Sequence, residues 1–184
     1  KNQGFIPIKD LAKDLTLLVE AFKMLEIEPR LIPSIMQLAD AENNKRVDLA
    51  HNSLGYQELI KFKDKLFLIN DTPCIDFSFS HALVDSLPTQ FSTLIFYLDP
   101  HQVEGELKLF RGKLTESFVP VGMNGAKTVN AILKDKGIPA FQRLDWPVLY
   151  VEDQPIGIPG VSLNRAFTPN PSLPSYLKVT FTAC

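Results

Sequence analysis

The stretch FVPVGMNGAKTVNAILKDKGIPAFQRLDWPVLY, residues 118–150, carries the strongest folding signals of the chain. Apolar side chains recur every three or four positions between residues 126 and 136, which predicts a short amphipathic helix. Gly137 follows, and glycine readily adopts the left-handed conformation that ends many helices. Ile138-Pro139 then begins a new segment, because the residue before a proline avoids the helical conformation. We therefore expect a helix over residues 126–136, ended by Gly137.

The predicted helix has two unlike faces. One face is apolar and consists of Val129, Ile132 and Leu133. The other face is polar and consists of Lys127, Asn130 and Lys134. A row of this kind is most often a solvated helix face. The charge of the surrounding segment favours a second interpretation, a surface that binds phosphates.

The segment from residue 107 to 147 is positively charged within an acidic chain. It contains seven basic and three acidic residues, a net charge of +4, whereas the whole 184-residue chain has a net charge of −2. The rest of the chain therefore sums to −6. Phosphate contacts supply most of the non-specific affinity of proteins for nucleic acids, so a local patch could serve where a basic field over the whole chain is lacking.

The sequence of the N-terminal part predicts a helical hairpin that is followed by a β-meander. Apolar residues at helical spacing predict one helix over residues 10–27, which Pro29 ends, and a second that closes near Asn43 and Asn44. Short runs of β-forming residues follow at 46–50, 56–62 and 65–69.

Further β-forming runs fill the remainder of the chain. They lie at 74–80, 92–98, 105–110, 147–151, 155–158 and 176–181. The predicted fold class is α+β, with an N-terminal helical hairpin and β-meander followed by a small α/β C-terminal domain. We place the domain boundary between residues 104 and 105, which gives domains 1–104 and 105–184.

The aromatic residues are interpreted as core. A cluster of them in the predicted strands is expected to pack inside the sheet: Phe77, Phe79, Phe91, Phe96 and Tyr97. Trp146 could provide a platform on which a nucleobase stacks, but a single tryptophan before a proline more often anchors a core.

Several classes of function find no support in the sequence. A Walker-type phosphate loop and a G-x-S-x-G elbow are both absent. His81 and Asp85 stand four positions apart without a matching nucleophile, and no histidines lie at metal-ligand spacing. We expect no catalytic residue, no metal and no membrane span. Cys74 and Cys184 lie too far apart in the sequence to suggest a disulfide framework, which favours a reducing cytoplasm.

Residues 118–167 resemble the C-terminal domain of tRNA(Ile)-lysidine synthetase. That family shows the pattern Phe-x-Pro-x-Gly-Met-x-Gly-x-Lys, then a short helix, Ile/Val-Pro, an Arg, an apolar-Pro pair and a β-hairpin. The matching positions are Phe118, Pro120, Gly122, Met123, Gly125, Lys127, Ile138, Pro139, Arg143, Pro147 and Gly160. Upstream, Arg111 fits the family, while Thr115 and Glu116 replace its Gly-Asp pair. The helical hairpin and meander resemble the family's middle, substrate-binding domain.

The resemblance implies a role in tRNA modification. The family uses ATP to attach lysine to the wobble cytidine of tRNA(Ile), a ligase reaction of an N-terminal domain with a Ser-Gly-Gly-x-Asp-Ser loop. This sequence lacks that loop, so we expect the chain alone to be neither an enzyme nor an ATP-binding protein. It would instead bind the tRNA body and acceptor stem in the cytoplasm. The residues expected at the RNA are Lys127, Lys134, Arg143, Arg111, Lys113 and Asn130.

The expected partners are tRNA and the enzyme's own N-terminal catalytic domain, and a homodimer is left open. Two alternatives remain. The chain could be a diverged protein-interaction or accessory module that does not bind RNA. Less in keeping with the sequence, it could be a separate enzyme that uses His81 and Asp85.

Overall fold

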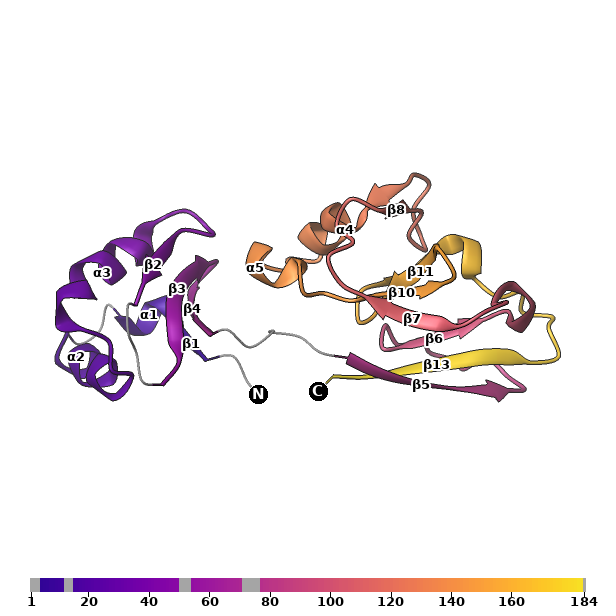
Figure 1. Ribbon diagram of the computed structural model, residues 1–184, viewed down its shortest axis with the longest axis horizontal. Helices are drawn as coiled ribbons and strands as arrows, with labels where there is room; N and C mark the ends of the chain where they lie inside the picture. Colours follow the sequence, from indigo (N-terminus) through magenta and orange to yellow (C-terminus); the bar gives the residue numbers. More distant parts are fainter. Residues whose placement is uncertain (1–3, 12–14, 50–53, 71–76, 184) are drawn as a thin grey trace. The chain divides into compact units, whose positions relative to one another are not determined.

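The computed structural model describes residues 4–11, 15–49, 54–70 and 77–183. Their contacts divide the chain into two compact units, Lys1–Cys74 and Ile75–Cys184 (Figure 1). Cys74 and Cys184, for which we expected no disulfide, lie outside the described residues. The longest described helix has ten residues, and no helix among the described residues has the length and apolarity needed to cross a membrane.

The N-terminal unit contains the two helices expected from the sequence, in shorter form. Its helical elements are α1 (Ile8–Leu11), α2 (Leu15–Met24), η1 (Pro29–Leu31) and α3 (Ile32–Asp40). Pro29 begins the 3-10 turn η1, where the missing amide of a proline costs no hydrogen bond. Phe22 of α2 and Ile35 of α3 are both buried in the core of this unit.

The predicted meander is confirmed and gains a fourth strand. The strands are β1 (Phe5–Pro7), β2 (Arg46–Asp48), β3 (Tyr56–Phe62) and β4 (Lys65–Asn70). They form an antiparallel sheet in the order β1-β4-β3-β2. The turn between β3 and β4 is tight, and Lys63 in it has a positive φ of 55°. Leu59 of β3 and Leu66 of β4 are buried in the same core as the apolar side chains of the helices.

The C-terminal unit is built from short antiparallel strands with a few helical turns. The strands are β5 (Phe77–Val84), β6 (Ile95–Leu98), β7 (Leu107–Phe110), β8 (Ser117–Phe118), β9 (Lys127–Thr128), β10 (Val148–Val151), β11 (Gln154–Ile158), β12 (Ser162–Leu163) and β13 (Tyr176–Ala183). The helical elements are η2 (Pro100–Gln102), α4 (Val129–Asp135), α5 (Ala140–Arg143) and η3 (Arg165–Phe167). The α+β class predicted from the sequence is confirmed.

The last strand corrects the predicted domain boundary. β13 pairs with β5 along its whole length and with β6 on its other edge, so the sheet order is β5-β13-β6. Residues 77–98 therefore belong to the same unit as the end of the chain. The division lies between Cys74 and Ile75, not between 104 and 105. Sequence periodicity could not reveal this, because the residues of β13 that pair with β5 lie 92 to 106 positions later in the chain.

Strand β10 organises the layers of the C-terminal unit. All four of its residues are buried, and successive side chains of a strand point to opposite faces of the sheet. Leu149 and Val151 belong to one core, together with Phe96 and Val179 of the β5-β13-β6 sheet. Val148 and Tyr150 belong to a second core that includes residues of α4. The β12-β11-β10-β7 sheet thus lies between helix α4 and the other sheet (Figure 1).

Helix α4 is shorter than the predicted helix over residues 126–136. Lys127 and Thr128 pair with β8 instead, and the Thr128 hydroxyl then accepts a hydrogen bond from the amide of Ala131 as the N-cap. At the other end Gly137 has φ 75°, the left-handed conformation expected there. The Gly137 amide donates to Lys134 and the Ile138 amide to Leu133, which satisfies the last carbonyls of the helix.

Candidate functional site

The predicted basic face of helix α4 is partly neutralised within the molecule. Lys127 lies on β9 before the helix, and its Nζ atom is 2.6 Å from Oδ2 of Asp135 at the helix end. The hydrogen bond from Lys127, together with its charge, lowers the pKa of Asp135. The Lys127 side chain keeps 39% of its exposure, but its charge is already balanced by a neighbour.

Arg143 and Asn130 serve the fold. The Arg143 Nε donates to the carbonyl of Ile138 at 2.8 Å, and one of its terminal nitrogens donates to the side-chain oxygen of Asn130 at 3.2 Å. These bonds tie α5 to the first turn of α4 and to the segment that follows the helix. We expected both residues at an RNA surface; the structure shows that they pair with each other, and their contact with RNA stays a prediction.

Lys113 belongs to a cluster at the edge of the second core. Its Nζ lies 3.1 Å from Glu116 and 5.7 Å from the ring centres of both Phe110 and Tyr150. The Tyr150 hydroxyl is buried and lacks a hydrogen bond of standard geometry among the described residues, yet it lies close enough to Glu116 to affect its ionisation. Burial, then Glu116, raises the pKa of Tyr150, while the Tyr150 hydroxyl and then Lys113 lower the pKa of Glu116.

Other cations of the C-terminal unit remain at the surface. Lys134 and Arg111, both predicted, are exposed, as are Lys136 and Arg165, which the sequence analysis did not include among the site residues. A terminal nitrogen of Arg165 lies 3.4 Å from the carbonyl oxygen of Met123, a long contact that leaves its other donors available. Arg111 already interacts with a neighbour, so Lys134, Lys136 and Arg165 are the exposed cations best placed to meet an anionic ligand.

The beginning of helix α4 does not offer a phosphate site. The amide of Val129 donates to the carbonyl of Glu116 and that of Asn130 to Leu114, while the Ala131 amide is capped by Thr128. Free backbone amides at a helix N-terminus can bind a phosphate, but here the amides of the first turn already have hydrogen-bond partners.

The glycine-containing loop before the helix is instead open to solvent. Pro120 accepts a hydrogen bond from the amide of Met123, and Gly122 between them has φ 82°, which favours glycine. The loop is fixed at its base because the amide of Val121 donates to Leu163 in β12. Residues 121–126 are all exposed, so a ligand can approach their backbone closely.

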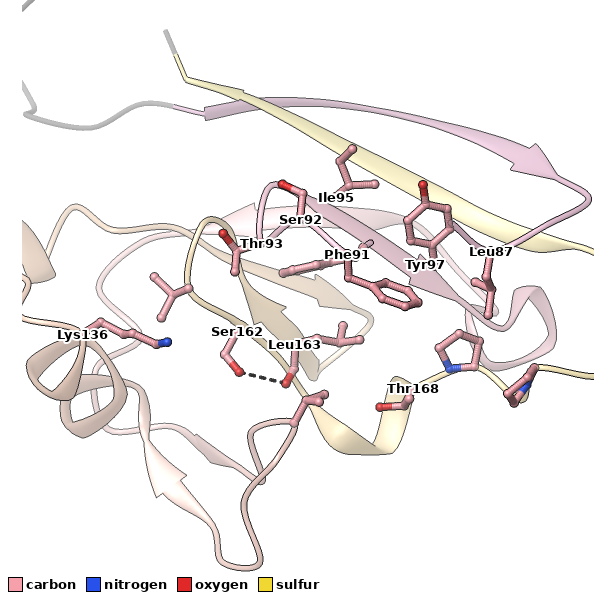
Figure 2. Close-up of a pocket in the computed structure, with 15 residues that line it drawn as sticks. Leu87, Phe91, Ser92, Thr93, Ile95, Tyr97, Lys136, Ser162, Leu163 and Thr168 are labelled. Carbon is pink, nitrogen blue, oxygen red and sulfur yellow. Dashed lines mark hydrogen bonds between the residues drawn. The ribbon is translucent and has the colours of Figure 1, made fainter. Parts of the chain in front are cut away.

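Two adjoining hollows lie beside this loop, and both are lined in part by Val121 and Thr168. One of them, here called the apolar hollow, has a volume of about 450 Å³. Figure 2 shows the aromatic rings of Phe91 and Tyr97 in it, with the Lys136 ammonium directed toward it from α4. The second hollow, of about 480 Å³, is more polar, and Arg165 and the loop residues 122–124 line it.

Phe91 corrects one prediction about the core. Of the five aromatic residues expected inside the sheet, Phe96 and Tyr97 are buried and Phe77 and Phe79 pack against that core. Phe91 is 67% exposed and lies in the loop between β5 and β6. The sequence could have indicated this exposure, because a single aromatic residue among polar ones does not indicate a buried strand. The polar neighbours of Phe91 are Thr89, Gln90, Ser92 and Thr93.

Trp146 packs against the second core, as we expected. Its indole Nε1 donates to the carbonyl of Pro159 at 3.1 Å, so it is not a free stacking platform. His81 lies in strand β5, which ends at Val84 just before Asp85, and the extended strand already separates His81 from Val84 by roughly 10 Å. The structure therefore gives no support to an acid–base pair of His81 and Asp85.

Comparisons with known proteins agree with this architecture. Residues 107–176 match the family model described as TilS substrate C-terminal domain. A tRNA(Ile)-lysidine synthase of Symbiobacterium thermophilum is 30% identical over 95 residues, which are 52% of this chain and 20% of that protein. The chain thus spans about a fifth of the length of this curated relative.

A crystal structure of a TilS C-terminal domain shares the fold. It superposes with a TM-score of 0.53 and 20% sequence identity, over 60% of this chain and 91% of that one. The resemblance that the motif of residues 118–167 predicted is therefore confirmed by family model, sequence relative and fold. Residues 107–176 of this chain are thus similar in sequence to the TilS substrate C-terminal domain, and the chain shares the fold of a TilS C-terminal domain.

Proposed function

We propose that this chain is the tRNA-binding part of a tRNA(Ile)-lysidine synthetase, the enzyme family that uses ATP to attach lysine to the wobble cytidine of tRNA(Ile). The match of residues 107–176 to the TilS substrate C-terminal domain carries the proposal. In this role the C-terminal unit would grip the tRNA body and acceptor stem. Catalysis and ATP binding would belong to a separate N-terminal domain of the same cytoplasmic enzyme.

The surface of the C-terminal unit supports phosphate binding by a smaller set of residues than the sequence suggested. Lys127, Lys113 and Arg143 are held by intramolecular partners. Exposed cations that remain include Lys134 and, beside the hollows, Lys136 and Arg165. Double-stranded RNA is recognised mainly through its shape, phosphates and 2′-hydroxyl groups, for which a few well-placed cations on a rigid scaffold are suited.

One observation favours a second candidate function, a protein-interaction module. The apolar hollow is lined mostly by apolar side chains and contains the exposed Phe91. Exposed apolar surface of this kind also occurs at protein–protein contacts. A binding experiment with RNA separates the two functions.

The test is the affinity of the 184-residue protein for a tRNA(Ile) transcript, measured by fluorescence anisotropy over a range of salt concentrations. We expect Lys136→Ala and Arg165→Ala each to weaken binding. Each lost phosphate contact should reduce the log–log salt slope by about 0.7 to 0.9. Lys108→Ala is the matched control, because this exposed lysine of the same unit is already paired with Glu106 at 2.8 Å.

A protein that fails to bind the transcript at low salt would overturn the tRNA-binding proposal. Unchanged affinity and slope in both variants would show that RNA contacts another surface. The protein-interaction module would be the function that fits the first of these results.

A further inference from the structure

The apolar hollow has features that the fold does not require. Phe91, Ile95, Tyr97, Val121, Leu163 and Pro169 supply much of its apolar lining. The Phe91 ring meets Tyr97 edge-on, with ring centres 5.9 Å apart, and remains 67% exposed. One aromatic face is thus offered to solvent inside a concave, otherwise apolar site, which is the usual character of a ligand pocket (Figure 2).

The charge around the hollow is of one sign. Among the described residues that line it, Lys136 is the charged one, and aspartate and glutamate are lacking. The adjoining hollow adds Arg165 and likewise has no acidic lining residue among those described. The hydroxyl groups of Ser92, Thr93, Ser162 and Thr168 also line the apolar hollow. This arrangement suits a ligand with a flat apolar part and an attached negative charge.

We propose that the apolar hollow receives one unpaired nucleobase of the bound RNA, stacked on Phe91, with the adjacent phosphate at Lys136. The proposal rests on the tRNA-binding function and adds a specific site to it. The volume of about 450 Å³ leaves room for a purine or a pyrimidine ring. A base in a duplex is stacked on its neighbours and cannot enter, so the hollow selects a single-stranded position of the RNA.

A nucleotide fits these observations better than an apolar peptide segment does. A purely apolar partner would leave Lys136 and Arg165 beside the contact without a counter-charge. The base would stack on the open face of Phe91, and the phosphate would pair with the Lys136 ammonium. Both features of the hollow would then have a partner. The side-chain hydroxyls can then bond to the edge of the base.

The experiment compares three substitutions of one residue in the full 184-residue protein. Stacking of a base on an aromatic ring accounts for roughly a 5- to 150-fold change in affinity. We therefore expect Phe91→Ala and Phe91→Leu to weaken binding of the tRNA(Ile) transcript by a factor in that range, while Phe91→Trp retains it. Because no charge is altered, the salt slope should stay the same. Leu83→Ala, at another exposed apolar residue of this unit, is the control.

A fully paired RNA duplex with blunt ends provides the second arm. Its binding should not respond to any Phe91 substitution, since it has no free base. If the wild type binds tRNA and Phe91→Ala or Phe91→Leu binds equally well, the base pocket is overturned while the tRNA-binding function stands. If Phe91→Leu retains affinity that Phe91→Ala loses, a general apolar contact replaces stacking. A wild type that does not bind tRNA overturns both proposals.

Discussion

Replacing Arg143 with alanine should destabilise the C-terminal unit, although the residue was first predicted to act at an RNA surface. The substitution removes a 2.8 Å bond to the carbonyl of Ile138 and a 3.2 Å bond to Asn130. Hydrogen bonds from charged groups contribute about 1.5 to 3 kcal/mol when well shielded, and less when solvent competes. Since the bond to Asn130 is exposed, we expect a total loss of about 1 to 3 kcal/mol in the free energy of unfolding.

Urea unfolding followed by tryptophan fluorescence measures this loss. Trp146 is the single tryptophan of the chain and lies in the C-terminal unit, so the signal follows that unit alone. Asn130→Ala and the double variant with Arg143→Ala complete a cycle, whose coupling energy should be about 0.5 to 1 kcal/mol. Lys134→Ala, at an exposed position, is the control and should stay within about 0.5 kcal/mol of the wild type. An Arg143→Ala variant as stable as that control would refute the structural role.

Three further predictions concern packing and ionisation. Gly157→Ala should cost about 1 to 3 kcal/mol of stability in the same assay, because its Cβ atom would lie 2.7 Å from the carbonyl oxygen of Ser162 and 2.9 Å from the Phe96 ring. Gly125→Ala, where a Cβ meets no atom within 4 Å, should be neutral; equal losses at both glycines would contradict this. The lowered pKa of Glu116 stabilises the folded protein above the ordinary pKa near 4.5, and this contribution is lost as the pH falls through the lowered value. Glu116→Gln should therefore flatten the acid side of the stability profile measured by urea unfolding, and an unchanged profile would argue against the interaction. Tyr150→Phe should flatten the alkaline side, because a raised tyrosine pKa makes the wild type lose stability above about pH 10; an unchanged alkaline side would contradict the raised pKa.

Local sequence signals predicted most helices and strands of the fold. Features that depend on pairing between distant strands were not predicted. The strand 56–62 matches β3, and Gly137 ends the helix as expected, because a hairpin and a helix cap depend on neighbours in sequence. The boundary at 104/105 was misplaced because β13 returns to pair with β5. The helix started later than predicted because Lys127 and Thr128 joined a strand.

The RNA contacts of the candidate site stay a prediction, but the structure shows which of its residues pair within the molecule. Residue type and local charge identified the basic segment, yet they could not show which cations have partners. The pairs Lys127–Asp135 and Arg143–Asn130 join residues 8 and 13 positions apart, separations that helix periodicity does not connect. The place of Phe91 in the apolar hollow could not be predicted for a related reason, since a hollow forms only where segments distant in sequence converge.

The central claim is that the C-terminal unit binds tRNA beside the loop of residues 121–126. Ultraviolet cross-linking of the protein to a tRNA(Ile) transcript, followed by mass spectrometry of the linked peptides, tests it most directly. The account predicts cross-links in the peptides that contain Phe91, Met123, Lys136 and Arg165, with their yield falling as salt is raised. A cross-linked complex whose contacts all lie elsewhere in the chain, or the absence of any tRNA complex at low salt, would contradict it.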